Sequence, residues 1–539
     1  MKNTDFLPIE KQKEKLLKNM YLFLLLSSLL SLTFFTLVSY KYRFHSDAAT
    51  AAMIALEQTR TGALYVKNWY YSQDFWPMFV FNGVVLLQPI VDNAFLATQI
   101  PVLLQTVIIF FLSFNILKIF SKNRLNYLLL AFLFSGVSNL WSEFFFGQGQ
   151  YGNVLMWTLL GLVFLIKAQL HLNASRNKLY FFGLFLINTY INTTSIRYVP
   201  LFSGAAILSL IFLYVVDLEK ATKNKPLLFL IINLTISTVL GQLIFSYLKL
   251  NYHFVSGVNG STLVDYDVML HENLPRLIHG LFGLMTDSGV GSPLASLKGI
   301  VFSYKFFMSL ILFGLPFCAV KKMIASFTKK QLTFPQQFLL IFTMIQLLIS
   351  LFSVLFIQTI INHIAAARYM MLPIFICMLL VPFLFDKFQM SLNKQFLICI
   401  GVLPLIFSNI YLLNKDNFSA PPQKAQLASF LLSNGLTHGY ATFWNADSLT
   451  VISNYKVKVY HITDTKLEPS LYMSSPFFYS QPDAKENFLL LTDEEVGKFD
   501  FETIKAHIGE PIKTLSFQGY KIFVYDKLFF NKMPNWANL

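Results

Sequence analysis

Charged residues are scarce in this chain of 539 residues, where Asp, Glu, Lys and Arg together make up 13%. An ordinary soluble protein carries about 25%. Hydrophobic residues reach 55% and aromatic residues 16%, so too few polar side chains remain to cover a water-soluble fold of this size. A soluble enzyme, a disordered chain and a fibrous repeat are therefore excluded. The composition predicts an α-helical polytopic membrane protein.

Cysteine is also rare. The three cysteines, Cys318, Cys377 and Cys399, lie inside apolar runs rather than in loops. This placement predicts neither a disulfide framework nor a cysteine-based metal site. Residues 1–20 are too charged to open an ordinary cleavable signal peptide, so the apolar run that follows is expected to remain as an anchor.

What the chain has in abundance is long apolar runs. Eleven of them are candidates to cross a hydrocarbon core roughly 30 Å thick. Another run, 79–88, is too short to span and ends at Pro89, which favours an interfacial or re-entrant segment. The predicted spans are 21–39, 95–120, 125–140, 154–170, 179–190, 199–216, 227–248, 300–320, 338–358, 369–385 and 396–413.

The net charge of +14 is unevenly distributed. Residues 414–539 hold 12 Lys, no Arg and 13 acidic residues, so the excess of basic residues belongs to residues 1–413. With a cytoplasmic N terminus, the predicted inner loops contain most of that excess, as the positive-inside rule requires. The protein is expected in the inner or plasma membrane. An odd number of spans then places its C-terminal segment on the extracytoplasmic side. Nucleic-acid binding is not indicated.

Three long polar stretches lie outside the predicted spans. Within the predicted transmembrane domain, 1–413, they are a first outer loop, 40–78, and a second long outer loop, 249–299. The first contains a helix-like stretch over 48–60 that ends before Gly62. Residues 414–539 form the third stretch and predict an extracytoplasmic α/β domain. Its expected strands cover 441–462 and 520–526, and its expected helices cover 425–436 and 494–509.

Ionisable residues at the ends of spans are costly to hold near lipid and are functional candidates for that reason. Acids among them could accept a proton from an attacking hydroxyl group. Arginines could bind a phosphate through their fork of donors. The candidates on the predicted outer side are His45, Asp47, Asp74, Glu143, Arg197, His363 and Arg368.

Four short motifs contain most of these candidates. The segment YKYRFHSDAATAAMIALEQTRTGALYVKNWYYSQDFWP (40–77) has an acid a few residues beyond the first predicted span, at the start of a helix. WSEFFFGQGQYGN (141–153) contains a further acid on the outer side. In SIRYVPL (195–201) and AARYMMLP (366–373), Arg-Tyr pairs begin helices that descend from the outer face. Together, these motifs resemble the GT-C superfamily of membrane glycosyltransferases, and the α/β tail matches bacterial members that use polyprenyl-phosphate sugars.

The resemblance implies a donor sugar on a polyprenyl phosphate and transfer, with inversion, to a hydroxyl group of an envelope glycan or lipid acceptor. By position, Asp47 matches the catalytic base. Ala48 follows it, so the paired acid of some members is absent. No metal ligand is assigned, and a divalent cation is left open as the one candidate cofactor. Arg197 and Arg368 match donor phosphate-binding residues, while Asp74, Glu143, His45 and His363 are expected to orient the acceptor or an ion.

Other interpretations stay open. Asp47, with Ser46, could simply cap the helix that follows. Arg197 and Arg368 could be interfacial anchors that extend to lipid headgroups. A transporter or flippase of lipid-linked sugars has comparable spans, although it usually shows internal repeats and polar groups at mid-membrane. A polysaccharide polymerase or ligase shares basic outer loops but is less consistent with the early acid and the folded tail.

Overall fold

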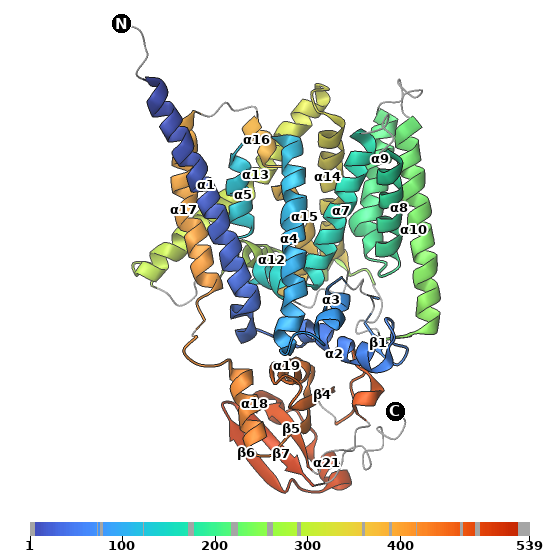
Figure 1. Cartoon of the computed structure of the whole chain (residues 1–539). Helices are drawn as coiled ribbons and strands as arrows, with labels where there is room; N and C mark the ends of the chain where they lie inside the picture. The colour runs from blue at the N-terminus through green and yellow to red at the C-terminus, as the bar shows by residue number, and fades with distance from the viewer. Residues whose placement is uncertain are drawn as a thin grey trace.

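The computed structural model describes residues 6–72, 74–75, 79–121, 123–170, 177–216, 225–255, 262–287, 293–357, 362–386, 391–416, 418–463, 467–479 and 486–526. They form a bundle of long helices with a smaller α/β unit at one end (Figure 1). The amino-terminal end of the first helix and the α/β unit lie at opposite ends of the bundle.

Nine helical segments in the described part of the chain are long and apolar enough to cross a membrane. A multi-pass membrane protein is therefore confirmed. The nine segments are Lys11–Leu37, Ala94–Phe120, Gln150–Leu170, Val199–Val216, Lys225–Asn251, Leu297–Thr328, Phe334–Phe356, His363–Phe385 and Leu392–Leu413.

The predicted count of eleven spans is not confirmed, because two helices are short. Helix α5 (Leu125–Leu133) has 9 residues and α8 (Asn177–Asn192) has 16, or roughly 13 and 24 Å at 1.5 Å per residue. The run expected over 125–140 is interrupted at Gly136, whose φ of 82° lies in the left-handed region that favours glycine. Ser138 then caps the next helix by accepting a hydrogen bond from Trp141 N.

The long helices differ in how much protein surrounds them. Helix α15 (His363–Met378) belongs to the most enclosed segment, with 78% of its apolar window buried, whereas α13 (Leu297–Thr328) has 22%. The remaining helices of the bundle are α1 (Phe6–Leu37), α4 (Ala94–Phe120), α6 (Asn139–Ser142), α7 (Gln150–Leu170), α9 (Gly204–Val216), α10 (Lys225–Asn251), α11 (Tyr266–Val268), α12 (Leu274–Met285), α14 (Phe334–Phe356), α16 (Pro382–Asp386) and α17 (Leu392–Leu413), with shorter turns η2 (Glu143–Gly147), η3 (Val199–Ser203) and η5 (Met269–Asn273).

The two outer loops meet between the bundle and the α/β unit. The first contains η1 (Ser39–Tyr42), α2 (Ser46–Thr61) and β1 (Tyr70–Tyr71), and β1 pairs in parallel with β2 (His253–Phe254) of the second. The predicted helix over 48–60 is confirmed, and Gly62 ends it with a φ of 66°. The short run at 79–88 forms α3 (Phe79–Leu87), which lies at the same level (Figure 1).

The C-terminal segment contains a five-stranded mixed sheet in the order β4-β3-β5-β7-β6. The predicted helix over 425–436 and strand over 520–526 are present. The single strand expected over 441–462 is wrong, because helix α19 separates β3 from β4, and the helix expected over 494–509 is divided in two. The elements are α18 (Gln423–Ser433), β3 (His438–Thr442), α19 (Phe443–Ile452), β4 (Lys458–Ile462), η6 (Pro476–Phe478), β5 (Asn487–Thr492), α20 (Asp493–Val496), α21 (Phe501–Ile508), β6 (Lys513–Phe517) and β7 (Tyr520–Tyr525).

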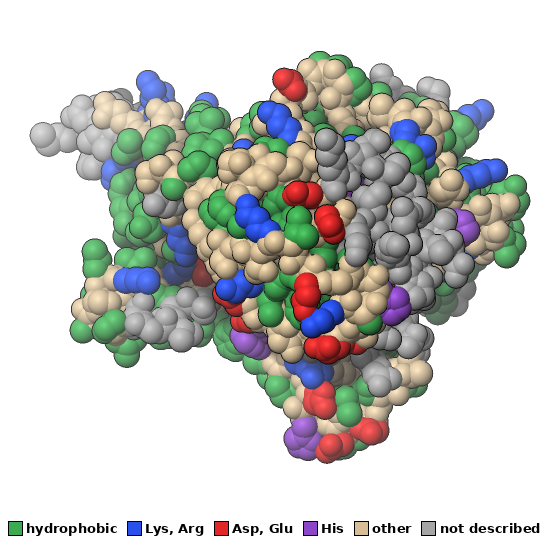
Figure 2. All heavy atoms as spheres, turned by 90° about the horizontal axis from the view of Figure 1, so that it is seen from below, with side chains coloured by type: hydrophobic (Ala, Val, Ile, Leu, Met, Phe, Trp, Pro, Cys, Tyr) green, Lys and Arg blue, Asp and Glu red, His purple; other side chains and the backbone are tan. Residues whose placement is uncertain are grey.

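Seen from the end that bears the α/β unit, acidic and basic side chains are interspersed on the visible described surface (Figure 2).

Candidate active site

Asp47 is the second residue of α2, which begins directly after the extended residue His45 (φ −127°, ψ 176°). The carbonyl oxygen of His45 accepts hydrogen bonds from the backbone N–H groups of Ala48 and Ala49, both at 3.1 Å. Neither the Ser46 hydroxyl nor the Asp47 carboxylate forms a capping hydrogen bond within the described part of the chain. The carboxylate is therefore not committed to a hydrogen-bonded helix cap.

The surroundings of Asp47 disfavour its charged form. Burial raises the pKa of the carboxyl above its ordinary value, and the neighbouring charge of Glu143 raises it further, whereas His45 and Arg368 oppose both effects. A carboxylate with a raised pKa is a stronger base once it is ionised.

Glu143 holds two residues of the first outer loop. Its Oε1 atom accepts a hydrogen bond of 2.5 Å from the Tyr40 hydroxyl and lies 2.7 Å from His45 Nε2. The side-chain amide of Gln148 lies 3.0 Å from the same imidazole nitrogen. Gly147 packs against the Tyr40 ring so closely that a Cβ atom there would lie 2.5 Å from a ring carbon. The motif at 141–153 thus fixes the backbone immediately before Asp47.

Arg197 is oriented by Asp74. Its NH1 atom lies 3.2 Å from Asp74 Oδ2, and the Ser195 hydroxyl donates a 2.5 Å hydrogen bond to the other carboxylate oxygen. The Asp74 side chain is only 2% exposed, whereas that of Arg197 is 37% exposed. Asp74 therefore orients Arg197 from the buried side of the site and does not itself face its open part.

Arg368 has a different environment. Its guanidinium carbon lies 5.1 Å from the centre of the Phe144 ring and 5.8 Å from that of Tyr151, distances typical of cation–π contacts. Its buried Nε atom has no hydrogen-bond partner among the described residues. Arg368 and Arg197 line one pocket, together with Tyr151 and Ser195. The two Arg-Tyr motifs, 171 residues apart in the chain, thus meet in space.

His363 does not join this group. Its ring stacks on that of His279, with 4.0 Å between ring centres. In the described ranges no contact joins it to Asp47, Glu143 or the two arginines. The sequence-based grouping of His363 with these residues gains no support from the geometry.

The α/β unit covers the site, a possibility that the sequence left open for residues 439–459. Helix α19 packs against α2, and the Trp444 ring centre lies 5.9 Å from that of His45. Lys424 Nζ donates a hydrogen bond to the carbonyl oxygen of Phe44 at 3.2 Å. Tyr472 interacts electrostatically with both Asp47 and Arg197, and burial raises its pKa to about 12.

Behind this surface lies a buried acid–imidazole pair. Asp447 Oδ2 lies 4.0 Å from His461 Nε2, and both side chains are at most 3% exposed. Burial raises the pKa of Asp447 well above its ordinary range, helped by the charge of Asp47. It lowers the pKa of His461 to about 3. His461 is therefore neutral near pH 7, and burial favours the neutral form of Asp447 as well.

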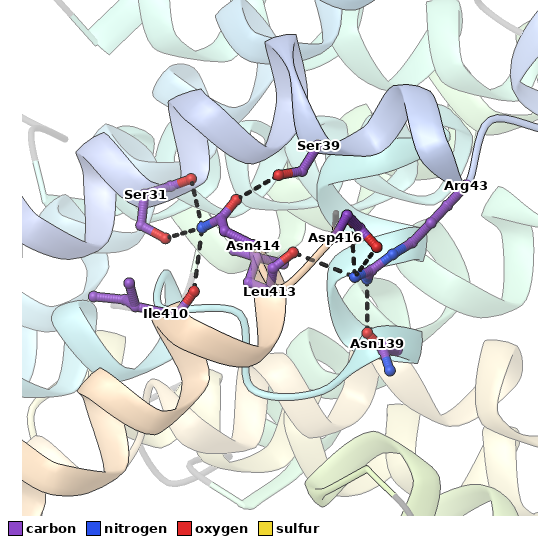
Figure 3. Close-up of polar contacts among 8 residues, drawn as sticks. All are labelled: Ser31, Ser39, Arg43, Asn139, Ile410, Leu413, Asn414 and Asp416. Carbon is purple, nitrogen blue, oxygen red and sulfur yellow. Dashed lines mark hydrogen bonds and ion pairs between the residues drawn. The ribbon is translucent and has the colours of Figure 1, made fainter. Parts of the chain in front are cut away.

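The connection between α17 and the α/β unit is tied to the first outer loop (Figure 3). Arg43 donates to Asn139 Oδ1 at 2.7 Å and pairs with Asp416 Oδ2 at 3.3 Å. Asn414 accepts a hydrogen bond from the Ser39 hydroxyl at 2.9 Å and donates one to Ser31 Oγ at 2.7 Å. These contacts fix the α/β unit relative to the segment that leads to Asp47.

Metal-binding residues were not assigned from the sequence. Across the described ranges, no three His, Cys, Asp or Glu side chains are grouped so that they could hold a metal ion.

Comparisons with known proteins were made at three levels. No protein-family model matches the sequence, and no curated protein matches it. The structure is similar to the crystal structure of ArnT from Cupriavidus metallidurans bound to undecaprenyl phosphate, with a TM-score of 0.55 and 10% identity over 94% of this chain and 98% of that one. The apo ArnT structure aligns with a TM-score of 0.40 at 10% identity, over 89% and 93% of the two chains. The chain therefore shares the overall fold of ArnT.

Proposed function

We propose that this protein is a membrane glycosyltransferase that moves a sugar from a polyprenyl-phosphate donor to a hydroxyl group of an envelope glycan or lipid. The observation that carries the proposal is the meeting of Arg197 and Arg368 in one pocket, with Asp47 close enough to Arg368 for their charges to interact. The similarity to ArnT bound to undecaprenyl phosphate supports a lipid-phosphate donor.

Donor binding uses the two arginines. A guanidinium group binds phosphate oxygens through parallel N–H donors, and Arg368 has a donor free for this among the described contacts. Phe144 and Tyr151 shield it from water, which strengthens its attraction to an anion. The same charges stabilise the leaving phosphate as the sugar–phosphate bond breaks.

Asp47 acts as the general base. The acceptor hydroxyl attacks the anomeric carbon from the side opposite the phosphate, so the new C–O bond forms as the C–O bond to phosphate breaks. The hydroxyl proton passes to Asp47, and polyprenyl phosphate leaves. Attack from the opposite side inverts the anomeric configuration. Glu143, through His45, positions the segment that carries Asp47.

The proposed orientation puts this site on the outer face. The N terminus is cytoplasmic, because most basic loops are then inside. Since the amino-terminal end of α1 and the α/β unit lie at opposite ends of the bundle (Figure 1), the α/β unit is then extracytoplasmic.

The decisive experiment compares wild type with Asp47→Asn in detergent, using a panel of polyprenyl-phosphate hexoses and an envelope extract as the source of acceptor. We expect release of free polyprenyl phosphate to fall at least about 1,000-fold, in keeping with loss of a general base in a preorganised site, while donor binding is kept. Asp267→Asn is the matched control, because the Asp267 side chain is 84% exposed and, within the described part of the chain, pairs only with His271.

Two results would contradict the proposal. Turnover unchanged in Asp47→Asn would remove Asp47 from the chemistry. Donor binding without cleavage of the sugar–phosphate bond by the wild-type protein, across all donors and in the presence of extract, would indicate transport rather than transfer.

A further inference from the structure

A second, larger cavity opens between the membrane bundle and the α/β unit. It has a volume of about 640 Å³ and is lined by the carboxyl-terminal end of α2, the connection from α3 to α4, and the turn after α19. We call it the junction groove. The polar residues in its wall are Thr59, Arg60, Gln88, Asp92, Asn454 and Tyr455. Its size is within the range of small-molecule sites, roughly 300–1,000 Å³.

Hydrogen bonds between the two units hold the groove in shape. Gln88 Nε2 donates to the Tyr455 hydroxyl at 2.7 Å, and the backbone N–H of Ala94 donates to Asn454 Oδ1 at 2.8 Å. Asn454 and Tyr455 both have positive φ angles, of 55° and 61°. Such conformations are unfavourable for residues other than glycine and are often found at ligand sites.

The charges in the groove argue against an anionic ligand. Arg60 is its one basic residue, and its guanidinium already forms two hydrogen bonds with Glu57, at 2.6 and 2.8 Å. Glu57 is buried and also accepts a hydrogen bond from Ser475. Since Asp92 adds an exposed carboxylate, the groove presents no uncompensated positive charge to a phosphate or a carboxylate.

The same residues suit a polyhydroxylated, uncharged ligand. Amide, carboxylate and hydroxyl groups can accept or donate hydrogen bonds with sugar hydroxyls, and a tyrosine ring can pack against the C–H face of a sugar.

The rim of the groove is apolar. Leu56, Pro89, Ile90 and Val91 are among the residues that line it, and Ile90 is 78% exposed. Exposed aliphatic side chains beside a polar groove favour a ligand that is attached to the membrane rather than one that arrives from solution. Helix α2 connects the groove to the candidate active site: Arg60 and Asp47 are 13 residues apart on it, or about 20 Å.

We propose that the junction groove binds the uncharged saccharide of a lipid-linked acceptor, at sugar residues distant from the reacting hydroxyl group. This inference rests on the proposed glycosyl transfer, because that reaction is what requires an acceptor. The groove selects the acceptor and takes no part in breaking the sugar–phosphate bond.

Photo-crosslinking tests the ligand directly. The photoreactive residue p-benzoylphenylalanine replaces Thr59 in protein reconstituted in nanodiscs with an envelope glycolipid extract, and adducts are identified by mass spectrometry. We expect saccharide-containing adducts at position 59 and none at the control position Thr514, which is exposed on β6. Adducts with phospholipid alone, or equal labelling at both positions, would overturn the proposal.

Steady-state kinetics test whether the groove contributes to acceptor binding. Thr59→Trp fills the groove and removes only a hydrogen bond within α2, from the Thr59 hydroxyl to Ala55 O. We expect KM for the extracted acceptor to rise at least tenfold, with kcat within twofold and donor binding unchanged, whereas Thr514→Trp has no effect. An unchanged KM for Thr59→Trp would refute the groove while leaving glycosyl transfer intact. If wild type releases no polyprenyl phosphate, the proposed function fails instead, and the crosslinking result still reports on the groove.

Discussion

The two walls of the candidate donor pocket hold their arginines in different ways. On one wall, Arg197 is bound to a carboxylate that is 2% exposed, so much of its charge is already compensated. On the other, Arg368 contacts two aromatic rings and interacts with the charge of Asp47, without forming an ion pair among the described residues. The first arrangement pairs the guanidinium directly with a carboxylate, whereas the second leaves it less compensated. Two similar Arg-Tyr motifs therefore need not contribute equally to binding.

The largest effect that we expect from this difference is on donor affinity. Arg368→Gln removes the positive charge that is less compensated and should weaken binding of polyprenyl phosphate by about 2–3 kcal/mol, as for a charge-assisted hydrogen bond in a shielded site. That corresponds to roughly a 30- to 150-fold increase in Kd, measured by native mass spectrometry. The uncharged polyprenol serves as the control ligand and should bind both proteins alike. A larger loss in Arg197→Gln than in Arg368→Gln would reverse the comparison.

The second effect concerns the free energy of unfolding, and we expect it for the wall that holds Arg197. Arg197→Gln leaves the Asp74 carboxylate buried without its cation, and breaking a buried ion pair in this way costs about 3–5 kcal/mol. Because the Arg197 side chain is 37% exposed, solvent reduces the expected loss to about 2 kcal/mol. Thermal unfolding in detergent should show a lowered Tm, and the double variant Arg197→Gln/Asp74→Asn should recover most of it. Arg368→Gln should leave Tm almost unchanged, and an equal loss of Tm in both single variants would contradict the assignment.

The sequence predicted the bundle side of this site better than the side formed by the α/β unit. Residues at the ends of apolar runs are visible in a sequence because charge is rare there, and this property identified Asp47, Arg197 and Arg368. It could not reveal that Asp74 faces Arg197, since that contact depends on how the first outer loop folds back onto the bundle.

Helix α19 was missed for a definite physical reason. It is covered by the sheet on one side and by α2 on the other, so Ala446, Leu449 and Val451 are all buried. Its buried residues include the polar Asp447, Ser448 and Thr450 as well as these apolar ones. A short element in which polar and apolar residues are both buried shows no helical period and cannot be distinguished from a strand by pattern alone. Trp444 and Asp447, which α19 brings towards Asp47, were therefore assigned to a strand and given no role.

The smallest effect that we expect separates the two interpretations of Asp47 itself. Folding raises the pKa of this carboxyl through burial, so its ionised form is less stable in the folded protein than in the unfolded chain. At any pH above the folded-state pKa, wild type bears this penalty and Asp47→Asn does not. We therefore expect the variant to be equally or more stable at pH 7–8, by no more than about 1 kcal/mol. The difference should disappear as the pH falls below the ordinary carboxyl range, where the carboxyl is protonated in both states. Tm measured from about pH 3 to pH 8 for both proteins tests this, with Asp267→Asn as the control. If Asp47 serves chiefly as a negative charge at the start of α2, Asp47→Asn would lower Tm at pH 7 instead, because an anion there stabilises the helix.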